Sequence, residues 1–474
     1  MAAYKQGVYV EEEPTALKTP INGNSALQVI FGTAPVNMTK EPSKTVNVPI
    51  LCNSFSECVE NLGYSGDYDS YTLCQSMDAN FRQFAVAPVV FVNVLDPEKH
   101  KKTNDETQCT VVNKKAKLAI TGVLATTLVI KDLEGNTLEA SDYTTSFDDD
   151  GTLDIVILKE GVETIKVTCD SIDPSLVTED DIIGGYDAET GKDKGLEVIR
   201  QVYPKLRMTA GLILAPGWSH KQTVAAVMEA KCKKINGVFG AECIIDLDTT
   251  TVKKYTDCQE AKELVQDISA IVCWPMVMMG GKKTYMSAVK GAEFAYYDAL
   301  NDDVPCMPSN HDIPITSTVL SDGTEVVLDT TQANVVNGTG VVTALNNDGW
   351  KSSGNEMSIY PSNTDPKDHW INARRFFTWW GNSFICTYKK KVGSQADKRL
   401  IESICNSENI RGNAYVAQGK CAAAHIEYRE EDNTADKVLA GEVTFRTHLA
   451  PYTPAKVIKN ILSFDPDALL ASLN

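Results

Sequence analysis

The sequence lacks long hydrophobic runs. No stretch of its 474 residues approaches the roughly 18 consecutive apolar residues that a membrane-spanning helix needs. Its beginning also lacks the basic segment, apolar run and small-residue cleavage site of a secretory signal. We therefore expect a protein that is made and kept in a cytoplasm and that has no direct contact with a membrane.

Positive charge is scarce as well. The formal net charge is −18, and the isoelectric point is near 4.9. A general affinity for nucleic acid would have to come from a local basic patch that works against this overall field. Proteins that bind single-stranded nucleic acid interleave aromatic residues with their basic ones. The short basic runs of this chain lack such aromatic residues; they are 99–102, 114–117 and 389–391. We expect no direct binding of nucleic acid.

Paired cysteines and histidines are missing too. The 13 cysteines are odd in number, scattered and never spaced as Cys-x-x-Cys, which argues against a disulfide framework and a structural zinc site. The six histidines never show the i, i+4 spacing that places two imidazoles of one helix on a metal. We therefore expect no metal site, no cofactor, and mostly reduced cysteines in the core.

Two segments resemble catalytic motifs, and both depart from the required pattern. Residues 280–284 resemble a phosphate-binding loop, but a methionine stands where the first glycine must be. Residues 217–221 resemble a nucleophile elbow, but Lys221 occupies a position that must be small. Ser219 and Gln222 fit a helix capping box instead. We predict that this protein is not an enzyme and that both segments are surface or capping groups.

The composition is that of a folded chain with several domains, since 43% of the residues are hydrophobic and 23% are charged. Apolar strands alternate with helical stretches, which predicts an α/β fold (α+β overall) with a helix-wrapped, largely parallel sheet. The expected core strands are 26–33, 89–95, 211–215, 243–247 and 268–274.

The texture changes between residues 104 and 180. Short β-prone runs are separated there by turn residues such as Glu134-Gly135-Asn136, which predicts a small all-β module inserted into the core. We expect five parts along the chain. They are an extended N-terminal arm (1–25), the first part of the core (26–103), an inserted β-sandwich-like module (104–180), an α/β domain (181–305), and a C-terminal core domain with an interlocking strand and tail (306–474).

Two segments are suited to pairing with other chains. Residues 7–13 alternate between apolar and polar before a proline-broken stretch, and residues 441–449 alternate strictly. A short arm cannot hold a fixed shape alone, but it gains by pairing with the edge of a neighbour's sheet. Either terminus could be the donor. We predict intersubunit strands at Gly7, Val8, Tyr9, Val10 and Glu11, and at Val443, Phe445, Thr447 and Leu449.

Aromatic residues gather between 370 and 384, a spacing typical of helix packing in a core or at a subunit interface. Trp379 and Trp380 are adjacent and point to different faces of the expected helix. We predict that at least one aromatic side chain contacts a partner subunit.

In its motifs and their order, the chain resembles the contractile tail sheath proteins of contractile-tailed phages and R-type bacteriocins. The likeness covers most of the chain in layout but only its ends in motif. The residues that carry it are Gly7-Val8-Tyr9-Val10-Glu11-Glu12, the block 370–375, Asn433-Thr434-Ala435-Asp436, Gly441-Glu442-Val443-Thr444-Phe445 and Leu449-Ala450-Pro451-Tyr452-Thr453-Pro454-Ala455.

The resemblance implies a structural subunit that forms hexameric rings, stacked helically around an inner tube. Contraction of this sheath would drive the tube through a target cell envelope. The implied partners are further copies of the chain, the inner tail tube protein, and the baseplate and tail terminator proteins, with no cofactor. It implies assembly in a host bacterial cytoplasm and a final place in a virion tail or an extracellular contractile particle.

A helix expected to begin near Ser394 carries Lys398 and Arg399 opposite its apolar residues. An acidic chain needs a local positive element to meet an acidic partner, so we predict that these two side chains face the tube. Two other classes stay open at this point. Strand and helix alternation alone would also fit a cytoplasmic α/β enzyme, and arms that pair between subunits would also fit a self-assembling shell or surface-layer protein.

Overall fold

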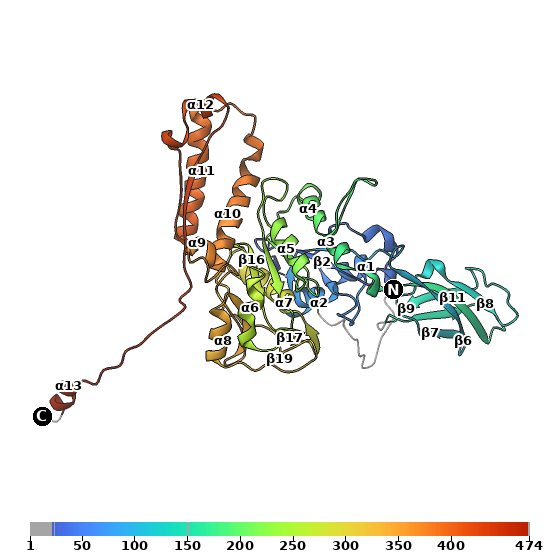
Figure 1. Cartoon of the computed structure of the whole chain (residues 1–474). Coiled ribbons are helices and arrows are strands. Elements are labelled where there is room, and N and C mark those ends of the chain that lie inside the picture. The colour runs from blue at the N-terminus through green and yellow to red at the C-terminus, as the bar shows by residue number, and fades with distance from the viewer. Residues whose placement is uncertain (1–20, 23, 149–150, 473–474) are drawn as a thin grey trace, which may run out of the picture.

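An eight-stranded mixed sheet lies at the centre of the computed structural model, which describes residues 21–22, 24–148 and 151–472 (Figure 1). Six neighbouring strands are parallel, and an antiparallel strand closes each edge. In spatial order the strands are β21 (Trp350–Ser353), β20 (Val341–Asn346), β16 (Ala270–Cys273), β15 (Glu242–Asp246), β14 (Leu212–Leu214), β2 (Gln28–Gly32), β5 (Val89–Asn93) and β3 (Ile50–Cys52).

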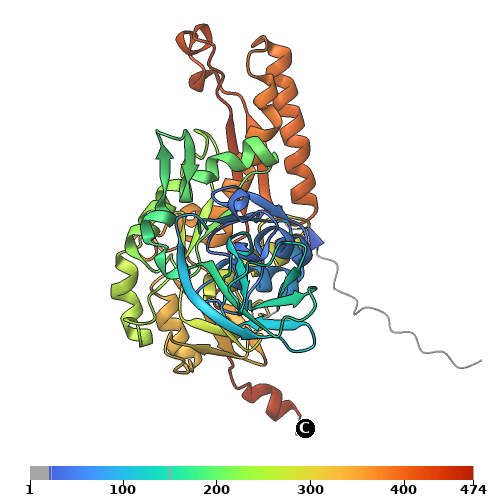
Figure 2. The same ribbon diagram turned by 90° about the vertical axis from the view of Figure 1, so that its right-hand side faces the viewer.

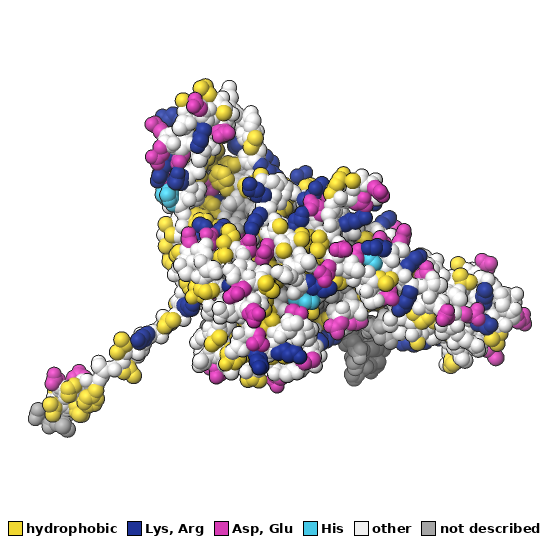
Figure 3. Space-filling model, in the orientation of Figure 1, with side chains coloured by type: hydrophobic (Ala, Val, Ile, Leu, Met, Phe, Trp, Pro, Cys, Tyr) yellow, Lys and Arg dark blue, Asp and Glu magenta, His cyan; other side chains and the backbone are white. Residues whose placement is uncertain are grey.

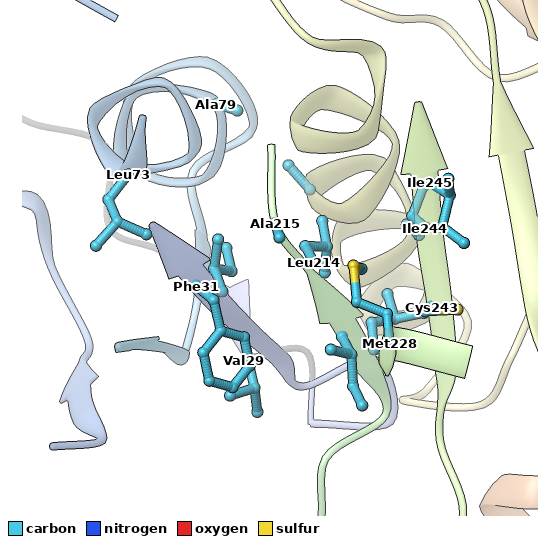
Figure 4. Close-up of a cluster of buried hydrophobic side chains, with 14 of the residues drawn as sticks. Val29, Phe31, Leu73, Ala79, Leu214, Ala215, Met228, Cys243, Ile244 and Ile245 are labelled. Atoms are coloured by element: carbon cyan, nitrogen blue, oxygen red, sulfur yellow. The ribbon is translucent and has the colours of Figure 1, made fainter. Parts of the chain in front are cut away.

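The central strands are buried on both faces, as their continuous apolar sequences require. Every residue of β2, β5 and β15 is buried, whichever face of the sheet its side chain takes. Figure 4 shows side chains of β2, β14 and β15 packed with Met228 of α5 (Gln222–Lys231). The helix α7 (Met286–Leu300) packs against β14 and β15. The predicted α/β fold is thereby confirmed, with a mixed sheet.

The segment between residues 101 and 172 forms two antiparallel sheets of three strands. The strand orders are β7–β10–β9 and β6–β11–β8. Most of the buried residues of this segment form a cluster of their own, while Leu124 and Ile172 belong to the main core, and the segment projects from one end of the molecule (Figure 1). Its strands are β6 (Lys101–Thr110), β7 (Lys115–Leu118), β8 (Val129–Asp132), β9 (Tyr143–Phe147), β10 (Leu153–Ile157) and β11 (Thr164–Ile172).

Shorter elements complete the body. The helices are α1 (Phe55–Leu62), α2 (Leu73–Met77), α3 (Glu179–Ile183), α4 (Ile199–Leu206), α6 (Cys258–Glu263) and α8 (Thr330–Asn337). The strands are β1 (Ile21–Asn22), β4 (Val86–Ala87), β12 (Gly185–Asp187), β13 (Lys192–Lys194), β17 (Met276–Met279), β18 (Lys282–Thr284) and β19 (Ser317–Val319). Among the described residues, no helix is both long enough and apolar enough to cross a membrane.

The helix α8 lies in the segment 302–354, which is rich in proline, asparagine, glycine and β-branched residues. Asp329 accepts a hydrogen bond from the backbone N–H of Gln332, and the Gln332 side chain accepts one from the N–H of Asp329. This reciprocal capping satisfies two backbone donors that would otherwise lack partners, and it accounts for a helix in a segment rich in turn residues.

The C-terminal residues form a projection that stands away from the sheet, followed by a long tail (Figures 1 and 2). We call the projection the C-terminal subdomain; it comprises α10 (Ile371–Tyr388), α11 (Lys398–Ala417), β22 (Cys421–Glu427), α12 (Ala435–Leu439) and β23 (Arg446–Pro451), and the short α9 (Pro366–His369) precedes it. The tail, residues 452–472, ends in α13 (Pro466–Ala471).

Candidate assembly interface

The C-terminal subdomain has an aromatic core of its own. Phe376, Trp380, Cys421 and Ala424 are buried together, and Trp379 packs against them. The rings of Trp379 and Trp380 both meet the Tyr415 ring of α11 edge-on, at 5.4 and 5.9 Å between centroids. Both tryptophans therefore pack within this chain, and the contact of at least one aromatic side chain of this cluster with a partner subunit stays a prediction.

A buried ion pair joins this subdomain to the body. Arg375 of α10 contacts the carboxylate of Asp298 on α7, and both side chains are almost fully buried. The same carboxylate accepts hydrogen bonds from Ser25 Oγ at 3.0 Å and from the backbone N–H of Cys306 at 2.9 Å. Because the desolvated charges are well supplied with partners, the pair can hold α10 in one orientation.

The strands β22 and β23 form a two-stranded antiparallel sheet, and within the described part of the chain they pair only with each other. One face packs on α11, whose Asn409 side chain bonds both the N–H and the carbonyl of Ile426. The outer edge of β23 faces no other strand among the described residues, so its backbone groups are available to another strand, whereas α11 already bonds the outer edge of β22 at Ile426. The open edge of β23 is one half of the candidate assembly interface.

The predicted strand residues lie in this sheet or beside it. Thr447 and Leu449 are in β23, and all four predicted side chains are half-buried while the residues between them are exposed. The strand begins at Arg446, however, so Val443 and Phe445 precede it. The side chain of Asn433 takes the place of a strand partner there, since it accepts from the Thr444 N–H at 2.6 Å and donates to its carbonyl at 2.8 Å.

The tail is the other half of the candidate interface. Lys456 ties its beginning to the body through an ion pair of 2.6 Å with the buried Glu356. Every residue from 455 to 472 is exposed. Figure 3 shows hydrophobic side chains along this segment. The most exposed of them are Val457 (79%), Ile458 (90%), Ile461 (78%), Leu462 (87%) and Phe464 (79%).

Such a row of exposed apolar side chains on a single chain is typical of a surface that another molecule covers. We predicted a C-terminal tail but named none of its residues as an interface. The run Val457-Ile458 followed by Ile461-Leu462 was the available signal.

The remaining predicted interface residues are placed as follows. Gly7, Val8, Tyr9, Val10 and Glu11 lie outside the described residues. Lys398 and Arg399 are exposed in the first turn of α11, and Nζ of Lys398 lies 3.7 Å from Oε1 of Glu402. The predicted helix start at Ser394 is wrong, because Asp397 caps α11 by accepting from the Leu400 N–H at 2.8 Å.

The segment around Ser219 differs from our expectation. Ser219 is fully buried and does not cap α5; it accepts a 3.1 Å hydrogen bond from the Asp246 N–H and donates to the Asp246 carboxylate. Ser287 also donates to this carboxylate, from its N–H at 2.8 Å and from its hydroxyl. Burial raises the pKa of Asp246 to about 6. The cluster joins the end of β15 to the start of α7.

The lysines of the other segment have partners within the chain. Residues 276–284 form the hairpin β17–β18, in which the Lys283 ammonium donates to the Ser321 carbonyl. The Lys282 ammonium lies 4.8 Å from the centroid of the Tyr68 ring. These contacts give both cations a packing role in the body.

Comparisons with known proteins agree with this arrangement, although no family model matches the chain. It is 24% identical over 463 residues to the tail sheath protein of Burkholderia phage BcepMu, covering 93% of each protein. Its fold matches a chain of the anti-feeding prophage baseplate with a TM-score of 0.58 at 13% identity, covering 98% of this chain and all of that one.

The fold also matches the contracted PVC sheath complex of an extracellular contractile injection system, with a TM-score of 0.56 at 14% identity and 99% coverage of both chains. At 13% and 14% identity the two structural matches show a shared fold. The phage protein that is 24% identical in sequence is a tail sheath protein. The resemblance of this chain to contractile tail sheath proteins is therefore confirmed along nearly its whole length.

Proposed function

We propose that this protein is a structural subunit of a contractile tail sheath. Its subunits would form hexameric rings, stacked helically around an inner tube, and contraction would drive the tube through a target cell envelope. The observation that carries the proposal is the exposed apolar tail together with the open outer edge of β23. A single chain that leaves both unpaired is suited to pairing them between copies.

The tail has the length and pattern of a donated strand. Nine residues, 457–465, precede α13, and at about 3.3 Å per residue they can extend roughly 30 Å. In an extended strand Ile458, Leu462 and Phe464 fall on one face, because side chains alternate. Backbone hydrogen bonds to the edge of β23 would supply affinity, and this apolar face would set the register.

The N-terminal arm is the second proposed donor. Residues 7–11 alternate between apolar and polar, so this arm suits the same kind of edge pairing. The open edge of β23 can accept one arm, and the added strand presents a new edge that can accept the other arm. Thr447 and Leu449 of β23, and Val443 and Phe445 just before it, then belong to the accepting subunit, whereas the sequence alone left donor and acceptor open.

Lys398 and Arg399 remain our proposal for the surface that faces the tube. Their exposure at the start of α11 leaves both charges available to an acidic partner. Exposed ion pairs are weak and screened by salt, so they would allow the sheath to slide along the tube. The segment 104–180 is proposed as an inserted β module that takes no part in these contacts, in the five-part organisation predicted from the sequence.

The remaining proposed partners are the inner tail tube protein, the baseplate and the tail terminator. Assembly would take place in a host bacterial cytoplasm, and no step requires a cofactor or an enzymatic activity. The test is negative-stain microscopy of the purified chain with and without the tube protein. Tubes of stacked rings are expected, whereas sheets, closed shells or a persistent monomer would contradict the proposal.

A further inference from the structure

We propose that the exposed face of the β22–β23 sheet binds a divalent transition-metal ion of the zinc type through His425, His448 and Glu427. The three ligands come from two paired strands, so their positions in the sequence do not show the i, i+4 spacing of a helical metal site. One ligand atom of each residue lies within 4.8 Å of the ligand atoms of the other two.

Strand pairing explains why the three side chains meet. His425 lies directly opposite His448 in the antiparallel ladder, and Glu427 follows two residues after His425 on the same face. The imidazole rings stack with 4.9 Å between centroids. The opposite face carries the buried Ala424 and Ile426, so the metal-binding face is the one turned away from α11.

The distances require only side-chain adjustment. Zinc bonds to imidazole nitrogen and carboxylate oxygen of about 2.0 to 2.2 Å place two tetrahedral ligands about 3.3 Å apart. Nε2 of His448 already lies 3.0 Å from Oε1 of Glu427. His425 is exposed, so rotation of its side chain can bring a ring nitrogen to the same ion. Two imidazoles and one carboxylate leave a fourth position for water.

One contact opposes metal binding. The guanidinium of Arg429 forms an ion pair with the Glu427 carboxylate, which must turn from the cation to the metal. Both side chains are partly exposed to water, which weakens the ion pair, so it costs little to break. A bound ion would fasten β22 to β23 next to the β23 edge that is proposed to accept an arm. The binding itself needs only one chain and does not depend on the proposed function.

The test is calorimetric titration of the untagged, reduced full chain with zinc chloride, at concentrations where it does not polymerise. We expect one ion per chain. His425→Phe and His448→Phe keep an aromatic ring in the strand but remove a ligand, and each is expected to weaken binding by more than the roughly 10-fold typical of losing a supporting residue. Glu430→Gln, an exposed acid outside the cluster, is the matched control and is expected to bind as the unaltered chain does.

Arg429→Gln gives the test its sharpest direction, because release of Glu427 should tighten zinc binding rather than weaken it. Cobalt substitution should give a visible spectrum without strong near-ultraviolet thiolate bands. Thiolate bands would assign the ion to cysteine and overturn the proposal. Undiminished binding in the doubly substituted His425→Phe, His448→Phe chain, with unchanged circular dichroism, would overturn it too, and so would the absence of binding at millimolar zinc.

Discussion

The tail offers the most direct test of assembly, through replacement of Leu462 by alanine. Its side chain is 87% exposed in the single chain, so nearly all of its apolar surface remains to be buried by a neighbour. Full burial of a leucine stabilises by about 1.5 to 3 kcal/mol. We expect the variant to lose about 2 kcal/mol per contact, which is roughly a 30-fold weaker association.

The measurement is the critical concentration for polymerisation, obtained by pelleting at a series of total concentrations and checked by microscopy. The variant should need a concentration higher by roughly the same 30-fold. The folded body should be unchanged, because this side chain is exposed, and thermal unfolding of the monomer should therefore match that of the unaltered chain.

The matched control is Lys459→Ala, which shortens a tail side chain on the opposite face of an extended strand. It should polymerise at nearly the normal concentration. A normal critical concentration for Leu462→Ala would show that the tail is not buried in the polymer. Equal damage from Lys459→Ala would show that the tail does not pair as an alternating strand.

Four further predictions concern the N-terminal arm, the proposed tube-facing residues, a buried ion pair and a buried carboxyl group. Deletion of residues 1–20 should leave a folded body that forms no tubes, and normal tubes from this variant would refute the arm's role. Lys398→Glu combined with Arg399→Glu should weaken assembly around the tube and change its salt dependence; if neither changes, these residues do not face the tube. Arg375→Ala should lower the free energy of unfolding by about 3 to 5 kcal/mol, because it leaves a buried carboxylate without its cation, and a loss below about 1 kcal/mol in urea unfolding would contradict this. Burial raises the pKa of Asp246 from 3.8 to about 6, so the folded state binds this proton more tightly than the unfolded state does. The free energy of unfolding should therefore fall by roughly 3 kcal/mol as the pH rises from about 4 to 6. Asp246→Asn should flatten that part of the dependence of stability on pH, and an unchanged dependence would contradict the shift.

Much of the central sheet could be predicted because its strands are apolar on both faces. The runs that became β2, β5 and β15 contain few polar residues, and helical periods follow several of them. In contrast, α8 depends on the local bonds between Asp329 and Gln332, which a composition rich in turn residues concealed.

The limits of the candidate site depended on contacts between distant residues. Strict alternation from 441 predicted a strand, but Asn433 holds the backbone of Thr444, and the ladder starts only at Arg446. Ser394 and Asp397 are both residue types that cap helices, and in the structure Asp397 is the cap because its side chain accepts a hydrogen bond from the Leu400 N–H. Ser219 was taken as a cap because the buried carboxylate that it meets is 27 residues away along the chain.

The tail also bears on how a sheath could contract without separating. Lys456 fixes its beginning to the body, with the ammonium 5.2 Å from the centroid of the Tyr360 ring as well as paired with Glu356. The residues that follow are exposed, so rotation of the body about this point disrupts no packing of the tail. A neighbour that holds residues 458–464 would therefore stay connected while the two bodies move between packings. In such a rigid-body rearrangement the difference in energy between states comes from contacts between bodies, and the paired strands serve as the constant link.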